Sequence, residues 1–198
     1  MPPDETAVDA IAVALRVADA IETAKGSYFV GGSLASSLQG EPRATNDIDM
    51  IVKLSLGRIG EFVTALGEDF EVDVDMLRDA LLHSRSCNIF YLPVVMKVDL
   101  FAVGSSAYDE TEFARRRRVP VRTTGETLLV KSPEDTVLRK LLWYRDGGGV
   151  SERQWRDVIE VLRVSGSGMD RGYIAQWGER LGISELLQRA RSETGGSA

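Results

Sequence analysis

Residues 29–52 have the sequence FVGGSLASSLQGEPRATNDIDMIV, and this stretch decides the fold. It starts with the end of a short apolar strand, turns at Gly31 and Gly32, and continues into a helical segment that ends at Gly40. After a loop, residues 46–53 alternate between apolar and polar side chains, as a half-buried strand does. The order of strand, glycine turn, helix, loop and acidic strand predicts an α/β domain.

The glycine turn is suited to binding phosphate. Gly31 and Gly32 have no side chains, so a phosphate can approach the backbone N–H groups there. Ser33 is expected to cap a helix over 33–39, whose N-terminus carries partial positive charge. These three residues are therefore predicted to contact phosphate.

Asp47 and Asp49 lie two residues apart on the strand that follows, with Ile51 as the one apolar exception on their face. Side chains at positions i and i+2 of a strand point the same way, so both carboxylates leave one face together. Adjacent carboxylates repel each other unless a cation lies between them, and a magnesium pair about 3.5–4 Å apart is the usual reason for this arrangement in phosphoryl transfer. The alternative is a solvated sheet edge with two surface acids.

A third acid is expected from a neighbouring strand over 95–102, where Lys97 and Asp99 share one face. Carboxylate ligands without histidine suit Mg²⁺ or Mn²⁺ rather than Zn²⁺. Asp47, Asp49 and Asp99 are thus the predicted catalytic residues and the predicted ligands of two metal ions. For Lys97 three interpretations stay open: it screens the carboxylates, it binds phosphate, or it is simply the outward residue of its strand.

The composition limits the classes of protein to consider. The chain has 198 residues, 43% hydrophobic and 27% charged, which is typical of a globular protein. One cysteine and one histidine exclude a disulfide framework and a Cys/His zinc site. A net charge of −6 argues against non-specific coating of nucleic acid. No apolar run approaches the roughly 18 residues that span a bilayer, and the N-terminus is acidic, so we expect no membrane contact and a cytoplasmic location.

The periodicity gives a coarse map of the whole chain. It predicts helices over 5–24, 33–39, 57–67 and 75–84, strands over 27–30 and 46–53, and hairpins of 86–92 with 95–102 and of 118–123 with 126–130. From Ser132 the pattern is helical, with a break at 147–149. We therefore expect a core with a small mixed sheet flanked by helices over 1–130, a helical part over 131–192, and a disordered tail over 193–198.

These motifs together resemble the nucleotidyltransferase-fold superfamily, which includes DNA polymerase beta and the minimal nucleotidyltransferases. The resemblance rests on Gly31-Gly32-Ser33, Asp47-x-Asp49 and Asp99. Two helical motifs resemble those of AbiEii-type nucleotidyltransferases, the toxins of type IV toxin–antitoxin systems and their relatives. They are Ser132-Pro133-Glu134-Asp135 continuing to Lys140, and Arg153-Gln154-Trp155-Arg156-Asp157 followed by Glu160.

The resemblance assigns further site residues. It implies that Lys140 helps to bind the nucleotide and that Asp157 completes the site, while Glu160 stands where the family has a second aspartate. Asp157 could instead pair with Arg153 one helical turn earlier. Arg43, on the loop before the acidic strand, is expected either to reach the triphosphate or the acceptor, or to brace its own loop.

The implied activity is metal-dependent transfer of a nucleoside monophosphate from a nucleoside triphosphate, such as ATP, to an acceptor hydroxyl. The acceptors of this family include RNA, protein side chains and antibiotics. A toxin of this kind would have an antitoxin protein as its partner. The competing hypothesis is a nucleotide-binding or partner-binding module on the same fold that catalyses no reaction.

Arg115, Arg116, Arg117 and Arg118 form the one basic run. Such a run is usually a solvated segment, but it is also where an acidic protein would contact RNA phosphates. An RNA acceptor therefore remains one prediction for this chain.

A second acidic cluster, Glu71-Val72-Asp73-Val74-Asp75, imitates the Asp-x-Asp motif. It follows no glycine turn, and Asp75 is expected to cap the next helix. We therefore predict that this cluster has no catalytic role.

Overall fold

A computed structural model of the chain describes residues 9–41, 45 and 47–195. By its internal contacts the chain divides into two compact units, one of residues 1–34 and 45–130 and the other of residues 35–44 and 131–198. The sequence-based division near 130 did not predict that 35–44 belongs with the helical unit. The helix α2 (Gly32–Gln39) therefore begins in the first unit and ends in the second.

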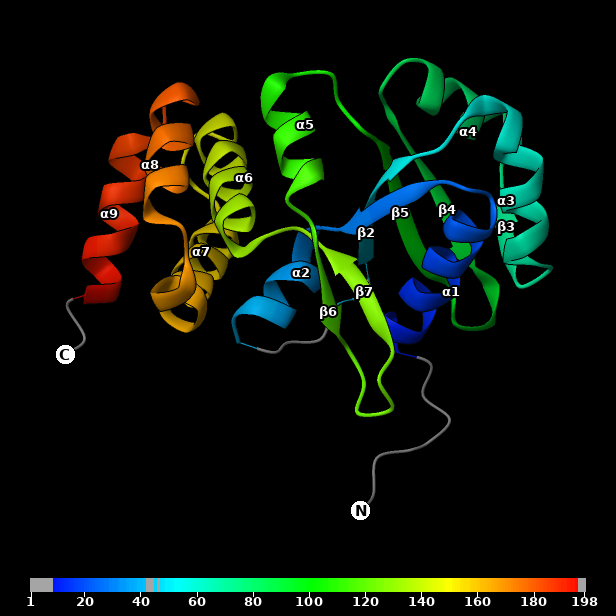
Figure 1. Ribbon diagram of the computed structural model, residues 1–198, viewed down its shortest axis with the longest axis horizontal. Helices are drawn as coiled ribbons and strands as arrows, with labels where there is room; N and C mark the ends of the chain where they lie inside the picture. The colour runs from blue at the N-terminus through cyan, green and yellow to red at the C-terminus, as the bar shows by residue number, and fades with distance from the viewer. Residues whose placement is uncertain (1–8, 42–44, 46, 196–198) are drawn as a thin grey trace. The chain divides into compact units, whose positions relative to one another are not determined.

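Within the described residues, the strands of the first unit form one seven-stranded mixed sheet in the order β3-β4-β5-β2-β1-β7-β6 (Figure 1). The strands are β1 (Ser27–Val30), β2 (Asp47–Lys53), β3 (Phe70–Val72), β4 (Ser86–Tyr91), β5 (Met96–Ala102), β6 (Arg117–Pro120) and β7 (Thr127–Val130). Two neighbouring pairs, β2 with β5 and β1 with β7, are parallel. The other neighbours are antiparallel. The fold class predicted from the sequence is therefore confirmed.

The core of this unit lies on one face of the sheet. Ile48, Met50 and Val52 of β2 are buried there because alternate side chains of a strand share a face. The helices that cover this face are α1 (Ala10–Thr23), α3 (Ile59–Leu66) and α4 (Val74–Leu82), which contact each other in that order. On the opposite face α5 (Ala107–Ala114) packs Phe113 against Phe29 of β1, with 5.7 Å between the ring centroids. The acidic side of β2 therefore faces away from the main core.

The second unit is helical. Besides most of α2, it contains α6 (Pro133–Asp146), α7 (Glu152–Ser165), α8 (Arg171–Arg180) and α9 (Ser184–Gly195). α7 packs against α6 and α9, and α6 also contacts α8. The helix α9 extends three residues into the segment expected to be a tail.

The motif at residues 132–135 organises the start of α6. The Ser132 hydroxyl accepts a hydrogen bond from the Asp135 backbone N–H at 3.1 Å, which caps the helix. The Tyr173 hydroxyl donates to the buried Asp135 carboxylate at 2.6 Å, and the Asp170 backbone N–H donates to Glu134 at 2.8 Å. Both acids therefore connect α6 to the beginning of α8, and these hydrogen bonds stabilise the packing of the two helices.

Most predicted elements are present, and the differences have local causes. Both predicted hairpins form. Ser33 was expected at the cap, but α2 begins at Gly32, so Ser33 lies in the first turn. The cap of α4 is Asp73 and not Asp75, because the Asp73 carboxylate accepts hydrogen bonds from the N–H groups of Asp75 and Met76.

Among the helices that the structure describes, none is long and apolar enough to cross a membrane.

Candidate functional site

The predicted carboxylates lie on two neighbouring strands of the sheet. In the parallel pair of β2 and β5, Asp47 is opposite Lys97 and Asp49 is opposite Asp99. All four side chains share the sheet face opposite to Ile48 and Met50, which are fully buried. The expectation that Asp99 lies on a neighbouring strand with matching parity is confirmed. Its catalytic role stays a prediction.

Lys97 forms ion pairs within this group of acids. Its Nζ lies 2.8 Å from Asp99 Oδ2 and 3.9 Å from Asp47 Oδ1. The hydrogen bond to Asp99 raises the pKa of the Lys97 ammonium above its ordinary value. The Asp99 side chain is 14% exposed, whereas that of Asp47 is 57% exposed. Of the three interpretations of Lys97, the structure favours screening of the carboxylates.

The glycine turn packs directly against this acidic face. The Gly31 N–H donates to the Asp49 carbonyl at 2.8 Å. Gly32 has a φ of +53°, and a Cβ added there would lie 1.6 Å from Asp49 Oδ2. Both the backbone conformation and the close approach therefore require glycine at this position. The sequence placed the turn and the acids in order along the chain, and the structure brings them into contact.

The acidic face offers only oxygen donors for a metal, together with one ammonium. In the part of the chain that the structure describes, no three histidine, cysteine, aspartate or glutamate side chains converge closely enough to enclose an ion. The ion pair of Lys97 with Asp99 and Asp47 nevertheless indicates that positive charge is stabilised here. Carboxylate oxygens are among the protein ligands that Mg²⁺ and Mn²⁺ prefer, so the residues present fit either ion by their chemistry.

Two residues of this face were missed by the sequence reasoning. Asn88 of β4 is opposite Asp99 in the sheet register, and it is exposed. Phe101 of β5 is opposite Ile51 and is 36% exposed, although it is a large apolar side chain. The sequence did carry a signal for Asn88. This polar residue stands between the apolar residues Cys87 and Ile89, as expected for a solvent-facing position on a strand.

The other predicted site pair lies in the helical unit. Lys140 Nζ of α6 lies 2.8 Å from Asp157 Oδ2 of α7 and 3.1 Å from Gln154 Oε1. The two charged side chains are only 4% and 8% exposed. The structure thus brings Lys140 and Asp157 together as a buried ion pair between two helices, a contact that sequence spacing alone did not indicate. Their contact with a nucleotide stays a prediction.

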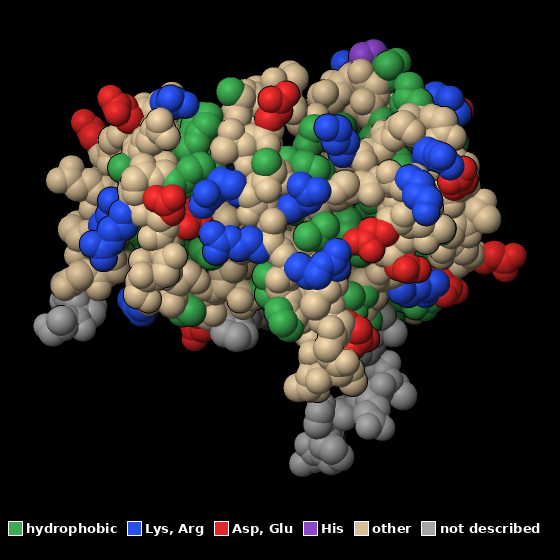
Figure 2. All heavy atoms as spheres, in the orientation of Figure 1, with side chains coloured by type: hydrophobic (Ala, Val, Ile, Leu, Met, Phe, Trp, Pro, Cys, Tyr) green, Lys and Arg blue, Asp and Glu red, His purple; other side chains and the backbone are tan. Residues whose placement is uncertain are grey.

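The basic run does not form one continuous surface. Arg115 and Arg116 are half-buried, and the Arg116 guanidinium donates to Ser27 Oγ at 2.8 Å and stacks over the Phe113 ring. Arg117 and Arg118 are exposed on β6, where Arg118 donates to Thr127 and lies 3.5 Å from Glu22. In Figure 2, Lys and Arg side chains over the sheet lie next to Asp and Glu side chains. Much of the charge of this run therefore has partners within the protein.

Arg43 lies outside the residues that the structure describes. Nearby, the Thr45 hydroxyl donates to the Asp47 carbonyl at 3.0 Å, at the entrance to β2. The prediction for Arg43 is therefore untested.

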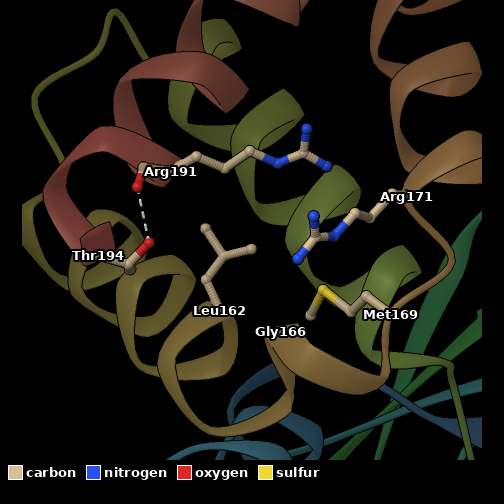
Figure 3. A pocket seen from close by; sticks show the side chains of 6 residues that line it. All are labelled: Leu162, Gly166, Met169, Arg171, Arg191 and Thr194. Carbon is tan, nitrogen blue, oxygen red and sulfur yellow. Dashed lines mark hydrogen bonds between the residues drawn. The ribbon is translucent and has the colours of Figure 1, made fainter.

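The helical unit contains a pocket that is separate from the predicted site residues. A pocket of about 320 Å³ lies there among α7, α8 and α9, and Arg171 and Arg191 extend into it above Leu162 and Met169 (Figure 3). None of the residues predicted from the sequence lines this pocket. The candidate site is therefore defined by charge and backbone geometry on the sheet.

Comparison with known structures identifies the fold. A crystal structure of an antigenic nucleotidyltransferase-like protein from Paracoccidioides brasiliensis matches with a TM-score of 0.53 and 19% identity, over 76% of this chain and 73% of that chain. The antibiotic-resistance factor ANT(2″)-Ia gives 0.48 and 17% identity, over 96% of this chain and 98% of that one. Its complex with adenylyl-2″-tobramycin gives 0.49 and 15%, over 84% and 92%.

No family model matches the chain, and no curated protein matches it. The first of these solved structures establishes that the chain has a fold found in nucleotidyltransferase-like proteins.

Proposed function

We propose that this protein is a metal-dependent nucleotidyltransferase, which moves a nucleoside monophosphate from a nucleoside triphosphate to an acceptor hydroxyl. The observation that carries the proposal is the register of β2 and β5, which sets Asp49 opposite Asp99 on the sheet face opposite to the main core. The glycine turn that contacts Asp49 adds a place where phosphate can approach the backbone. The fold is compatible with this activity.

Asp47, Asp49 and Asp99 are the residues that would hold two Mg²⁺ or Mn²⁺ ions. When bound, such ions lower the pKa of an attacking hydroxyl and neutralise charge on the departing pyrophosphate. The protein itself would orient the triphosphate. Backbone N–H groups at Gly32 and Ser33 would bind phosphate oxygens at the start of α2, where the helix dipole favours negative charge. No histidine base is needed, because phosphoryl transfer depends mainly on positioning and electrostatics.

The finer parts of the proposal rest on the motif resemblance alone. These are the binding of the nucleotide by Lys140, the completion of the site by Asp157, and a role as an AbiEii-type toxin with an antitoxin partner. A contact of Arg43 with the triphosphate or the acceptor is proposed from its place in the sequence just before β2. The acceptor is proposed as RNA, a protein side chain or a small hydroxylated molecule. Arg117 and Arg118 are the exposed members of the basic run that an RNA acceptor would meet first.

The test is transfer of label from α-³²P nucleoside triphosphates in the presence of Mg²⁺ or Mn²⁺. Candidate acceptors are a transfer RNA pool, a protein lysate and a set of aminoglycosides. The wild-type chain should label one of them, and Asp49→Asn should not. The matched control is Asp75→Asn, which changes an exposed acid at the start of α4 and should leave labelling intact.

The outcomes also separate the proposal from its alternative. Binding of the triphosphate without transfer to any acceptor would favour the non-catalytic module. Labelling by Asp49→Asn at the wild-type rate would refute the assignment of the metal ligands. For the toxin role, expression of the wild type but not of Asp49→Asn should arrest growth of the host cells.

A further inference from the structure

Lys97 places a permanent positive charge where the proposed function needs a divalent cation. Its ammonium is 2.8 Å from Asp99 and 3.9 Å from Asp47, and it is attached to the same strand as Asp99. Three carboxylates on one face would otherwise repel one another strongly. The Lys97 ammonium therefore offsets the repulsion among the three carboxylates in the metal-free protein.

The same ammonium competes with a metal for Asp99. It occupies one carboxylate oxygen through a charge-assisted hydrogen bond, and it would repel a divalent ion at that carboxylate. Metal binding at this oxygen of Asp99 therefore requires that the ammonium move away. Lysine has a flexible four-carbon stem, and the Lys97 side chain is 36% exposed, so the group is able to move without repacking the core.

A nucleoside triphosphate would provide the displaced ammonium with a new partner. Its phosphate oxygens are strong acceptors, and the proposed phosphate position at Gly32 adjoins the Asp49 carboxylate on the same sheet face. Without the triphosphate, the carboxylates of Asp99 and Asp47 are the partners of the ammonium.

We propose that Lys97 is a built-in cation that couples metal binding to triphosphate binding. It holds Asp99 in the free protein and exchanges Asp99 for a phosphate oxygen when the triphosphate binds. In the free protein the site accordingly has low affinity for metal, and the two ligands bind cooperatively. This inference rests on the proposed function, since it takes the three carboxylates as the metal site.

The experiment measures Mn²⁺ affinity by electron spin resonance, with and without the α,β-methylene analogue of ATP. The variants are Lys97→Met, Lys97→Arg and the control Lys53→Met. Lys53 is on the same face of β2 but about 13 Å along the strand from Asp49, so its removal changes the net charge by the same amount at a distance. In the wild type and in Lys53→Met, the analogue should strengthen Mn²⁺ binding about tenfold, a usual size for coupling between two ligands.

Lys97→Met should bind Mn²⁺ more tightly than Lys53→Met when no nucleotide is present. The analogue itself binds Mn²⁺ through its phosphates, so it should still strengthen binding, but by a smaller factor than in Lys53→Met. Lys97→Arg keeps the charge and should retain part of the coupling. A second readout needs no ligand: in EDTA and at low ionic strength, Lys97→Met should unfold at a lower temperature than Lys53→Met, and added Mn²⁺ should remove the difference.

Two negative results have different meanings. Equal Mn²⁺ affinity and equal enhancement in Lys97→Met and Lys53→Met would refute the role of Lys97 and leave the proposed function standing. Absence of Mn²⁺ binding in every variant, with and without the analogue, would overturn the metal site itself and the coupling with it.

Discussion

Substitution of Gly32 by alanine tests the contact on which the candidate site depends. The added Cβ would lie 1.6 Å from Oδ2, 2.5 Å from Cγ and 2.9 Å from Cβ of Asp49. Rotation of the Asp49 side chain about its Cα–Cβ bond can relieve the first two overlaps. The third involves an atom fixed to the backbone of β2, so the strand or the turn must also shift.

The expected cost has two parts. A non-glycine residue in the left-handed region, here at a φ of +53°, costs about 1–2 kcal/mol. Forcing an extra carbon into a packed contact costs about 1–3 kcal/mol. Gly32→Ala should therefore lower the free energy of unfolding by about 2–5 kcal/mol and, by displacing Asp49, should abolish nucleotidyl transfer.

Urea unfolding followed by circular dichroism measures the effect. The control is Gly57→Ala, because a Cβ at Gly57 meets no atom within 4 Å. An Asp49→Ala background removes the overlaps with Oδ2 and Cγ but keeps the one with Cβ. Gly32→Ala should therefore cost less there than in the wild type, but more than the backbone part of about 1–2 kcal/mol. If Gly32→Ala were as stable as Gly57→Ala, the turn would not pack against Asp49 and the geometry of the site would be wrong.

Three further predictions concern residues outside the acidic face. Lys140→Met and Asp157→Asn should each lower the free energy of urea unfolding by about 3–5 kcal/mol, because either removes one charge of a buried ion pair; unchanged stability with weaker nucleotide binding would instead favour a binding role for Lys140. Replacing both Asp73 and Asp75 by asparagine should leave transfer intact and stability within about 1 kcal/mol, since asparagine also caps helices; loss of labelling in the folded variant would contradict our choice of acidic strand. Burial raises the pKa of the Cys87 thiol from 9.0 to about 11. The protonated thiol therefore stabilises the fold fully below pH 9, and this stabilisation is lost as the pH rises toward 11. Cys87→Ala should lose less stability than the wild type between about pH 8 and about pH 10.5, and an identical pH dependence of unfolding in both proteins would refute this.

The elements that the sequence did not predict are those with weak local signals. Strand β3 has three residues, too few to display an alternation. Helix α5 buries Tyr108, Glu112 and Phe113, and this mixture does not stand out as an apolar face. Its start was nevertheless marked by the capping box of Ser106 with Asp109.

Helix caps show a related limit. Asp73 and Asp75 are both good capping residues by type. Which of them caps α4 depends on where the chain leaves β3, and that is set by the pairing of β3 with β4. The choice between them therefore depends on contacts distant in sequence.

The sequence by itself determined that Asp47, Asp49 and Asp99 leave the outer faces of two strands, because the parity of side chains depends only on the pleat of each strand. The tertiary structure decided that these strands are parallel neighbours, and it decided which residue stands opposite which. Register depends on turns and packing far along the chain, and a slip of one residue would have set both Lys97 and Asp99 on the buried face. For the same reason only the folded chain reveals Lys97 as the counter-ion of Asp99.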